Sequence, residues 1–444
     1  MKKRATRGQT TRPEVNEEAA AVAWELQRHL SPEVVDELRE GTGYNPRQRV
    51  ATAFRVMLTV VEAFLVGQTL SFATLRAIFV RRFGAVRSCP FQKRFKQASA
   101  AAFFKAALER LVASVVESAG LQLRGPLAKF ADVRLYDGTV QRVPPRGRKA
   151  LPSCTAGRAG AKWVAGYSLK TGLLEEATFA PETASETPLW RKLVPSFTRR
   201  VLYVFDLGFF ERRLFAEAQD QGAHVLMRLK KSAKVRVVGQ LRDGNLLPVD
   251  GWSLAYFLSC TRTRRKGTLF DLDVVWGKGN EAVRLRLVGY AHSSKQIRWY
   301  LTTVPRYMLS APQVIETYRL RWLVEFLFRE LKQNADLGRS FTANSHAIEA
   351  LTYGAMLAHV LVRSLRIEAA LRNEIPIEQL RPLACLHVAR AFARDIVDAL
   401  ASCSRTAFAD LLVHMTPTLL AIAREQKPSR SRTRISLILG AVGA

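Results

Sequence analysis

The sequence predicts an α/β fold: a mixed core of strands and helices, interrupted by a β-rich insertion and flanked by helical segments at both ends. Two changes of hydrophobic period predict it. Apolar residues recur at three- and four-residue spacing toward both ends of the chain, whereas the middle carries short extended runs separated by turn residues. We expect a helical N-terminal domain over 1–125, a core over 126–234 and 298–344, an inserted β domain over 235–297, and a helical C-terminal domain with a basic tail over 345–444.

Length and charge indicate several structural units and a polyanionic partner. A chain of 444 residues can form more than one hydrophobic core. Lys and Arg number 68 against 38 acidic residues, which gives a formal net charge of +30. Nucleic acid is the partner that this charge favours. Because 48% of the residues are hydrophobic, the chain is expected to be folded rather than a disordered basic polymer.

Cysteine usage and the N-terminus favour a cytoplasmic location. The five cysteines include no Cys-x-x-Cys pair, so neither a zinc knuckle nor a disulfide framework is predicted. The basic N-terminus is followed by polar sequence, unlike a signal peptide. The longest apolar stretch, 56–75, contains Glu62 and Gln68, which are costly at a bilayer centre. We therefore expect no membrane span.

Within the helical front end, two segments resemble a helix-turn-helix. Residues 71–82 predict one helix, Gly84 a break, and 90–98 a second helix that carries Lys93 and Arg94. Positive side chains on the second helix suit phosphate contacts. An ordinary helical hairpin with a solvated basic face is the alternative.

From residue 131 the pattern changes to strands, and this change predicts the core. Apolar residues flank Asp137, two further extended runs are separated by a turn at 170–172, and helices then alternate with buried strands. The expected strands are 133–140, 163–169, 173–179, 201–205 and 224–229, and the expected helices are 183–193 and 210–219. Three antiparallel strands followed by alternating helices and strands is the layout of a ribonuclease-H-like core.

The insertion and the C-terminal part follow. Residues 235–297 are rich in strand and turn residues and show no helical period. Helical periodicity returns over 311–334 and continues in three more helices from residue 345, before a tail with four basic residues.

One polar stripe on the helix predicted at 311–334 is the most informative feature. On a helical wheel, Arg321, Glu325, Arg329 and Lys332 all fall within about 60° of Tyr318. The leucines and valine between them are expected to bury the rest of the helix, so that only this stripe faces outward. Pairing of i, i+4 charges on a solvated helix is the alternative.

The spacing of this stripe resembles the signature of insertion-sequence 4 (IS4) family transposases: Tyr, two residues, Arg, three residues, Glu, six residues, Lys. Tyr318, Arg321, Glu325 and Lys332 match it position by position. The family also needs two aspartates upstream. Asp137 after the first core strand and Asp206 after a buried later strand fill both places. Taken singly, each aspartate is equally compatible with an ordinary turn.

The resemblance implies a DDE enzyme in which Asp137, Asp206 and Glu325 are both the catalytic residues and the metal ligands. Three carboxylates are hard oxygen ligands that suit Mg²⁺ or Mn²⁺, and two such ions can activate an attacking oxygen and stabilise a leaving one. The expected reaction is cleavage of DNA at transposon ends followed by strand transfer into target DNA.

DNA contacts are also implied by the resemblance. Tyr318, Arg321 and Lys332 are expected to hold phosphates and displaced nucleotides. Trp299 is expected to stack on a flipped base, although it could instead pack within a sheet. Arg228 is expected either to face DNA or to be a plain strand-end arginine.

The expected partners are double-stranded DNA, as terminal inverted repeats and as target, and a second subunit, because a transposon has two ends. Two alternatives remain open. One is a catalytically silent DNA-binding protein of the same fold, and the other is a nuclease that cleaves without strand transfer.

Overall fold

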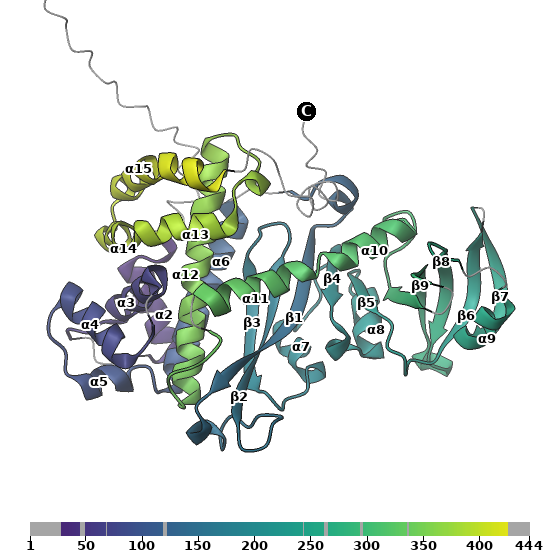
Figure 1. Ribbon diagram of the computed structural model, residues 1–444, viewed down its shortest axis with the longest axis horizontal. Helices are drawn as coiled ribbons and strands as arrows, with labels where there is room; N and C mark the ends of the chain where they lie inside the picture. Colours follow the sequence, from purple (N-terminus) through teal and green to yellow (C-terminus); the bar gives the residue numbers. More distant parts are fainter. Residues whose placement is uncertain are drawn as a thin grey trace, which may run out of the picture.

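A single ten-stranded sheet runs through the computed structural model, with a body of helices at one end and the insertion at the other (Figure 1). The structure describes residues 28–44, 49–67, 69–118, 122–242, 244–261, 265–293, 296–334 and 337–424. The predicted basic tail lies outside these residues. The strands are β1 (Asp132–Val143), β2 (Ala159–Ser168), β3 (Leu174–Pro181), β4 (Val201–Phe205), β5 (His224–Arg228), β6 (Val235–Arg242), β7 (Asn245–Ser253), β8 (Leu269–Trp276), β9 (Val283–Ala291) and β10 (Ile297–Thr302).

The strand order is β3-β2-β1-β4-β5-β10-β9-β8-β6-β7. Strands β1, β2 and β3 form an antiparallel meander, whereas β1, β4 and β5 run parallel to one another. Strand β4 is buried and apolar along its whole length, and the middle of β5 is buried too, as expected for strands covered on both faces of a sheet. All five core strands were predicted from the sequence.

The insertion extends the core sheet. Strand β10 pairs antiparallel with β5 on one side and with β9 on the other, so the hydrogen-bonded ladder passes without a gap from the core into β9, β8, β6 and β7. The insertion also contains helix α9 (Leu254–Cys260), which begins at the Ser253 N-cap, so the expectation of no helix there was wrong. At seven residues, α9 is too short to show a helical period.

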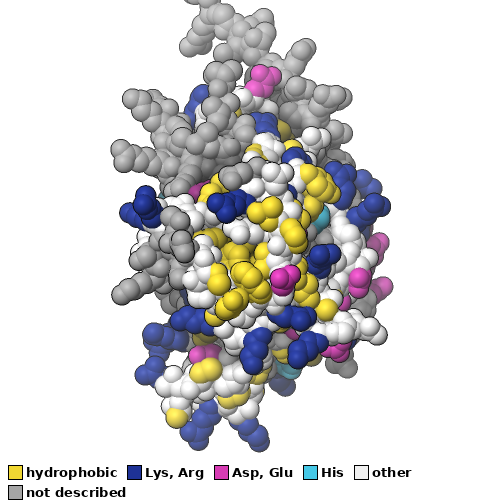
Figure 2. All heavy atoms as spheres, turned by 90° about the vertical axis from the view of Figure 1, so that its right-hand side faces the viewer, with side chains coloured by type: hydrophobic (Ala, Val, Ile, Leu, Met, Phe, Trp, Pro, Cys, Tyr) yellow, Lys and Arg dark blue, Asp and Glu magenta, His cyan; other side chains and the backbone are white. Residues whose placement is uncertain are grey.

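The outer end of the insertion has an apolar centre. Figure 2 shows hydrophobic side chains gathered in the middle of this face and Lys and Arg side chains around them. Exposed residues of β7, α9 and β8 include Leu246, Leu247, Tyr256 and Leu269.

The N-terminal helices are α2 (Pro32–Thr42), α3 (Ala53–Val66), α4 (Phe72–Phe83), α5 (Ser88–Lys93) and α6 (Ala98–Ser118). Capping residues fix their starts. Ser31 accepts a hydrogen bond from the Val34 amide, and Ser71 accepts one from the Thr74 amide. Gly84, with a φ of 93°, ends α4 at the predicted break.

The C-terminal helices are α12 (Ser345–Arg372), α13 (Pro382–Ala391), α14 (Ala393–Ser402) and α15 (Arg405–Ala423). Helix α12 packs against α3 and α6 as well as α13. The helical segments from the two ends of the chain therefore share one hydrophobic core rather than forming two separate ones.

Two helices are relevant to the prediction that the chain has no membrane span. The apolar stretch 56–75 lies largely in α3, which is buried by protein. Over Thr406–Ala423, α15 is long and apolar enough to cross a membrane by length and composition, with a mean hydropathy of 1.4. It packs on α13 and α14.

The two faces of the sheet carry separate cores. One face packs against α6, α12 and the helices α10 (Ala311–Arg319) and α11 (Trp322–Asn334), and the other against α7 (Thr187–Leu193) and α8 (Arg212–Asp220). Along β1, Val133 and Leu135 belong to the first core and Tyr136 to the second. Since side chains alternate along a strand, Asp137 points to the first face, toward α11.

Candidate active site

Two aspartates meet where the parallel pairing of β1 with β4 ends. The last paired residues of β1 and β4 are Tyr136 and Phe205. Asp137 and Asp206 are the next residues in each chain segment, so the strand register brings them side by side. Asp206 is also the N-cap of the short 3₁₀ turn Leu207–Phe209, which carries the chain away from the sheet. Asp206 follows an apolar strand as its sequence pattern indicates, whereas the expectation that Asp137 ends the first core strand was wrong, because β1 continues to Val143 in its pairing with β2.

Glu325 comes from a helix that differs from the predicted one. The sequence predicts one continuous helix over 311–334, but the chain forms α10 and α11 with a turn at Leu320 and Arg321. There the Leu323 amide donates to the Leu320 carbonyl, a three-residue hydrogen bond that replaces the four-residue bond of an α-helix. Neither proline nor glycine stands at the break. Glu325 consequently lies in the first turn of α11.

Arg321 joins the three carboxylates. Its Nη1 lies 2.5 Å from Asp137 Oδ2, its Nη2 2.7 Å from Glu325 Oε1, and its Nε 3.7 Å from Asp206 Oδ1. The guanidinium is 13% exposed, whereas the Asp206 and Glu325 side chains are 37% and 31% exposed. A single cation from the turn between α10 and α11 thus offsets the mutual repulsion of three acids from three elements.

The electrostatics of Asp137 reflect this crowding. The pKa of its carboxyl is raised to about 6, mainly by burial and also by the charges of Asp206 and Glu325, while Arg321 and the Gly138 amide act to lower it. Asp137 Oδ1 accepts a hydrogen bond of 2.8 Å from the Gly138 amide. The site therefore holds an acid that titrates close to neutral pH, a feature that clusters at functional sites.

Tyr318 closes α10 beside the carboxylates. Its side chain is buried, and its ring packs 5.1 Å from the Tyr300 ring of β10. Burial raises the pKa of its hydroxyl, the Asp206 charge raises it further, and Arg321 opposes both. Tyr318 is thus a neutral phenol that lies between the carboxylates and β10.

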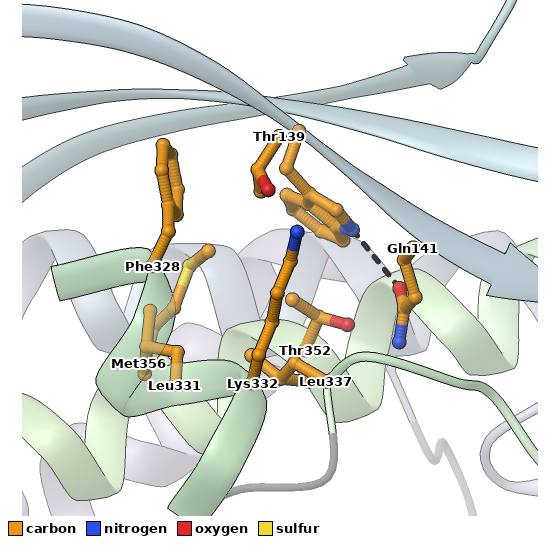
Figure 3. A pocket seen from close by; sticks show the side chains of 9 residues that line it. Thr139, Gln141, Phe328, Leu331, Lys332, Leu337, Thr352 and Met356 are labelled. Atoms are coloured by element: carbon orange, nitrogen blue, oxygen red, sulfur yellow. Dashed lines mark hydrogen bonds between the residues drawn. The ribbon is translucent and has the colours of Figure 1, made fainter. Parts of the chain in front are cut away.

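Lys332 lies two turns beyond Glu325 and points into a pocket between the sheet and α12. In Figure 3 its side chain rises from α11 toward Thr139 on β1, which is two positions after Asp137 and on the same face. The pocket is lined by Thr139, Gln141, Trp163, Phe328, Leu331, Lys332, Leu337, Thr352 and Met356. Burial among these mostly uncharged groups lowers the pKa of the ammonium.

The rest of the predicted stripe is different. Arg329 is exposed and stacks on Phe326, with its guanidinium carbon 5.1 Å from the ring centroid. The expectation that only the polar stripe would face outward was wrong, because Trp322 and Phe326 are 55% and 46% exposed. These two rings lie one turn apart on α11, next to the carboxylates, and sequence periodicity assigned them to no site.

Trp299 and Arg228 lie on different faces of the sheet. Trp299 packs over Gly289, its partner on β9, and its ring centroid is 5.4 Å from that of Phe270. It belongs to the core on the α8 face, away from Tyr318, which agrees with the packing alternative. Arg228 is exposed at the end of β5, directly opposite Tyr300.

Lys93 and Arg94, the basic residues predicted to contact DNA, differ in their exposure to solvent. Lys93 is exposed at the end of α5. Arg94 follows that helix, is half-buried near Tyr44, and has its pKa lowered by burial. Arg94 thus lies partly inside the helical body. The predicted second helix, 90–98, is shorter in the structure and ends at Lys93.

Comparison with known proteins places the chain in a family. Residues 128–361 match the family model described as a transposase DDE domain. The transposase for insertion sequence element IS231B of Bacillus thuringiensis subsp. berliner is 20% identical over 78% of this chain and 79% of its own length. Transposase InsG for insertion sequence element IS4 of Escherichia coli (strain K12) is 25% identical over 53% and 52%.

Among solved structures, a piggyBac transposase synaptic complex with hairpin DNA matches with a TM-score of 0.46 and 11% identity, over 98% of this chain and 87% of that one. The family model spans more than half of the chain, including both aspartates and the whole Tyr318 to Lys332 signature. The chain therefore belongs to the transposase DDE domain family and is a DDE transposase of the insertion-sequence 4 type.

Proposed function

We propose that Asp137, Asp206 and Glu325 form the site at which this transposase cleaves DNA at the ends of its mobile element and joins the freed ends to target DNA. The convergence of the three carboxylates on Arg321 carries the proposal. Placing three carboxylates around one arginine leaves net negative charge and electrostatic repulsion, which a function that binds further cations would explain.

The strand order supports a ribonuclease-H-like assignment for the core. The order β3-β2-β1-β4-β5, with the first three strands antiparallel and the last two parallel to β1, is that layout. We assign residues 126–234 and 298–344 to this core and 235–297 to the insertion. The helices before and after it are assigned to DNA-end recognition and to contacts between subunits.

The donor set fits Mg²⁺ or Mn²⁺. As the side chains lie, no three acidic, histidine or cysteine residues of the described ranges are grouped so that they could hold one ion. Arg321 contacts all three carboxylates instead. Carboxylate oxygens are the ligands that these ions prefer, and movement of the guanidinium would free them. When bound, a pair of ions would activate the attacking oxygen and stabilise the leaving one.

The chain's own residues supply binding and orientation. Arg321 has a planar, permanently charged group suited to a phosphate, so DNA offers it an alternative partner to the carboxylates. Tyr318 is neutral and can donate a hydrogen bond to a phosphate or base. Lys332 is a partly buried ammonium beside β1, where burial lowers its pKa and an anionic group would raise that pKa again.

The substrate proposed is duplex DNA, first at the element's terminal repeats and then as target, acted on in the cytoplasm. Two subunits are proposed, one for each end. The net charge of +30 supports a polyanionic substrate.

The test is cleavage and joining of a labelled duplex that carries the DNA bordering the gene, with Mg²⁺ or Mn²⁺. Glu325→Gln should abolish nicking and joining. Glu37→Gln, a change of the same kind at an exposed position of α2, should leave both intact. Nicking without joining would indicate the nuclease alternative. Salt-sensitive binding without nicking would indicate the silent DNA-binding alternative.

A further inference from the structure

Basic residues gather around Tyr300 on the α10 face of the sheet. Arg228 lies directly opposite Tyr300 across the pairing of β5 with β10. Arg298 is two positions before Tyr300 on β10, and hence on the same face. Arg319 ends α10, where it is half-buried and pairs with Glu316. Arg228, Arg298 and Arg319 form what is called here the Tyr300 basic cluster, and the Tyr300 ring packs on Tyr318 of the active site.

The charges of all three arginines affect the pKa of the Tyr300 hydroxyl. Burial raises the pKa of the Tyr300 hydroxyl, and the positive charges of Arg298, Arg319 and Arg228 oppose that rise. The Arg228 charge also acts on the Tyr318 hydroxyl. The cluster is therefore continuous in space with the signature residues of the active site.

Neighbouring arginines of the same sheet face are neutralised, and this contrast is informative. Arg286 Nη2 lies 2.6 Å from Asp271 Oδ2, and Arg306 Nη2 lies 3.1 Å from Asp271 Oδ1. Those arginines hold β8, β9 and the segment before α10 together. Across the described part of the chain, neither Arg228 nor Arg298 has a carboxylate partner, and both are exposed. Unlike Arg286 and Arg306, Arg228 and Arg298 therefore use their positive charges for no ion pair that holds the fold together.

The basic surface continues onto the insertion. His292 follows β9, and burial together with the charges of Arg298, Arg319 and Lys266 lowers the pKa of its ring. Tyr290 is the cross-strand partner of Arg298, and its ring centroid is 4.8 Å from that of His292. Cations interleaved with aromatic rings are typical of a surface that follows a nucleic-acid backbone.

We propose that the Tyr300 basic cluster binds backbone phosphates of the DNA duplex that runs from the active site toward the insertion. The inference rests on the proposed function, because it takes DNA as the substrate held at Asp137 and Glu325. Strand spacing of about 5 Å and a rise of about 3.3 Å per residue put Arg228 and Arg298 within reach of the same backbone. The cluster positions DNA and takes no part in bond breaking.

The experiment compares Arg228→Gln/Arg298→Gln with a control, Lys192→Gln/Arg213→Gln, whose exposed residues lie on α7 and α8 over the opposite face. Fluorescence anisotropy measures the affinity of each protein for a labelled duplex of the bordering DNA over a series of NaCl concentrations without divalent metal. The cluster variant should lower the slope of log K against log salt by about 1.8, since each phosphate contact contributes about 0.9. The control should keep the wild-type slope.

A second measurement separates positioning from folding. With metal, the cluster variant should show a raised KM for DNA and an unchanged kcat at saturating DNA. Equal salt slopes for the cluster variant, the control and the wild type would overturn the inference, even if the wild type cleaves DNA normally. Conversely, a wild type that binds without cleaving would refute the proposed catalysis, and the slope would still decide the role of the cluster.

Discussion

Removal of the Arg321 charge should strengthen divalent-metal binding by the DNA-free protein. In the structure this guanidinium makes close contacts of 2.5 Å and 2.7 Å with Asp137 and Glu325. A cation that takes both carboxylates has to displace it. Arg321→Met leaves a side chain of similar length without charge, so the carboxylates repel one another and attract a metal ion more strongly.

The magnitude follows from those two contacts. Each charge-assisted hydrogen bond contributes about 1.5–3 kcal/mol, so the pair is worth about 3 kcal/mol at the lower end. Because Glu325 is partly exposed, solvent screening reduces this to about half. A difference of about 1.5 kcal/mol corresponds to a roughly tenfold lower Kd for Mn²⁺.

Isothermal titration calorimetry with Mn²⁺ at pH 8 would measure this Kd, at a pH where Asp137 is ionised. Arg329→Met is the matched control, since Arg329 is on the same helix and stacks on Phe326. The control should bind Mn²⁺ like the wild type. An Arg321→Met protein that binds Mn²⁺ equally or more weakly would refute the idea that Arg321 competes with the metal.

Three further predictions concern pH and stability. The pKa of Asp137 is raised to about 6, so the folded protein binds the proton of this carboxyl more tightly than the unfolded chain does. The stability that this proton contributes should fall as the pH rises from about 4 to about 6. Asp137→Asn should flatten this part of a curve of unfolding free energy against pH. Arg363 Nη2 lies 2.7 Å from Glu330 Oε2 of α11, and the Arg363 side chain is largely buried. Arg363→Met should therefore lower the free energy of unfolding by about 3–5 kcal/mol, measured by urea unfolding with tryptophan fluorescence. A smaller loss in the double variant Arg363→Met/Glu330→Met would identify the unpaired carboxylate as the cause. A Cβ at Gly289 would lie 2.4 Å from the Trp299 ring, so Gly289→Ala should lower the thermal midpoint by an amount equivalent to about 1–3 kcal/mol. Adding Trp299→Leu to that variant should recover part of the lost stability. An unchanged midpoint for Gly289→Ala would contradict this packing of Trp299 on Gly289.

The local pattern of the sequence was enough to predict the elements that carry the carboxylates. Val201 to Phe205 is an unbroken apolar run before Asp206, and such a run followed by turn residues identifies a buried strand end. The fixed spacing from Tyr318 to Lys332 identifies the third element. Which strands are neighbours was also predictable, because the core follows a common layout of consecutive strands.

Features that depend on distant residues could not be predicted. The turn at Leu320 and Arg321 has no glycine or proline, and Arg321 contacts Asp137 across 184 positions of sequence. Arg81 and Arg82 form part of a basic run, yet both pair with the fully buried Glu62. Charge patterns show which residues are basic, but only the tertiary structure shows which are already neutralised.

Exposure and strand register are missing from the sequence for similar reasons. The helical wheel predicted that only the polar stripe of α11 faces outward, and no local rule states that Trp322 and Phe326 lie on a side without a neighbour. The pairing of β10 with both β5 and β9 also depends on strands that lie far apart in the chain.

The packing of α12 against α3 and α6 links the two ends of the chain during biosynthesis. Apolar faces of α3 and α6 are covered by α12, and α3 packs on α13 and α14 as well. A nascent chain therefore cannot complete this core until these C-terminal helices have been made. A chain truncated before α12 leaves those faces uncovered and is a substrate for proteases and chaperones rather than a shorter working enzyme.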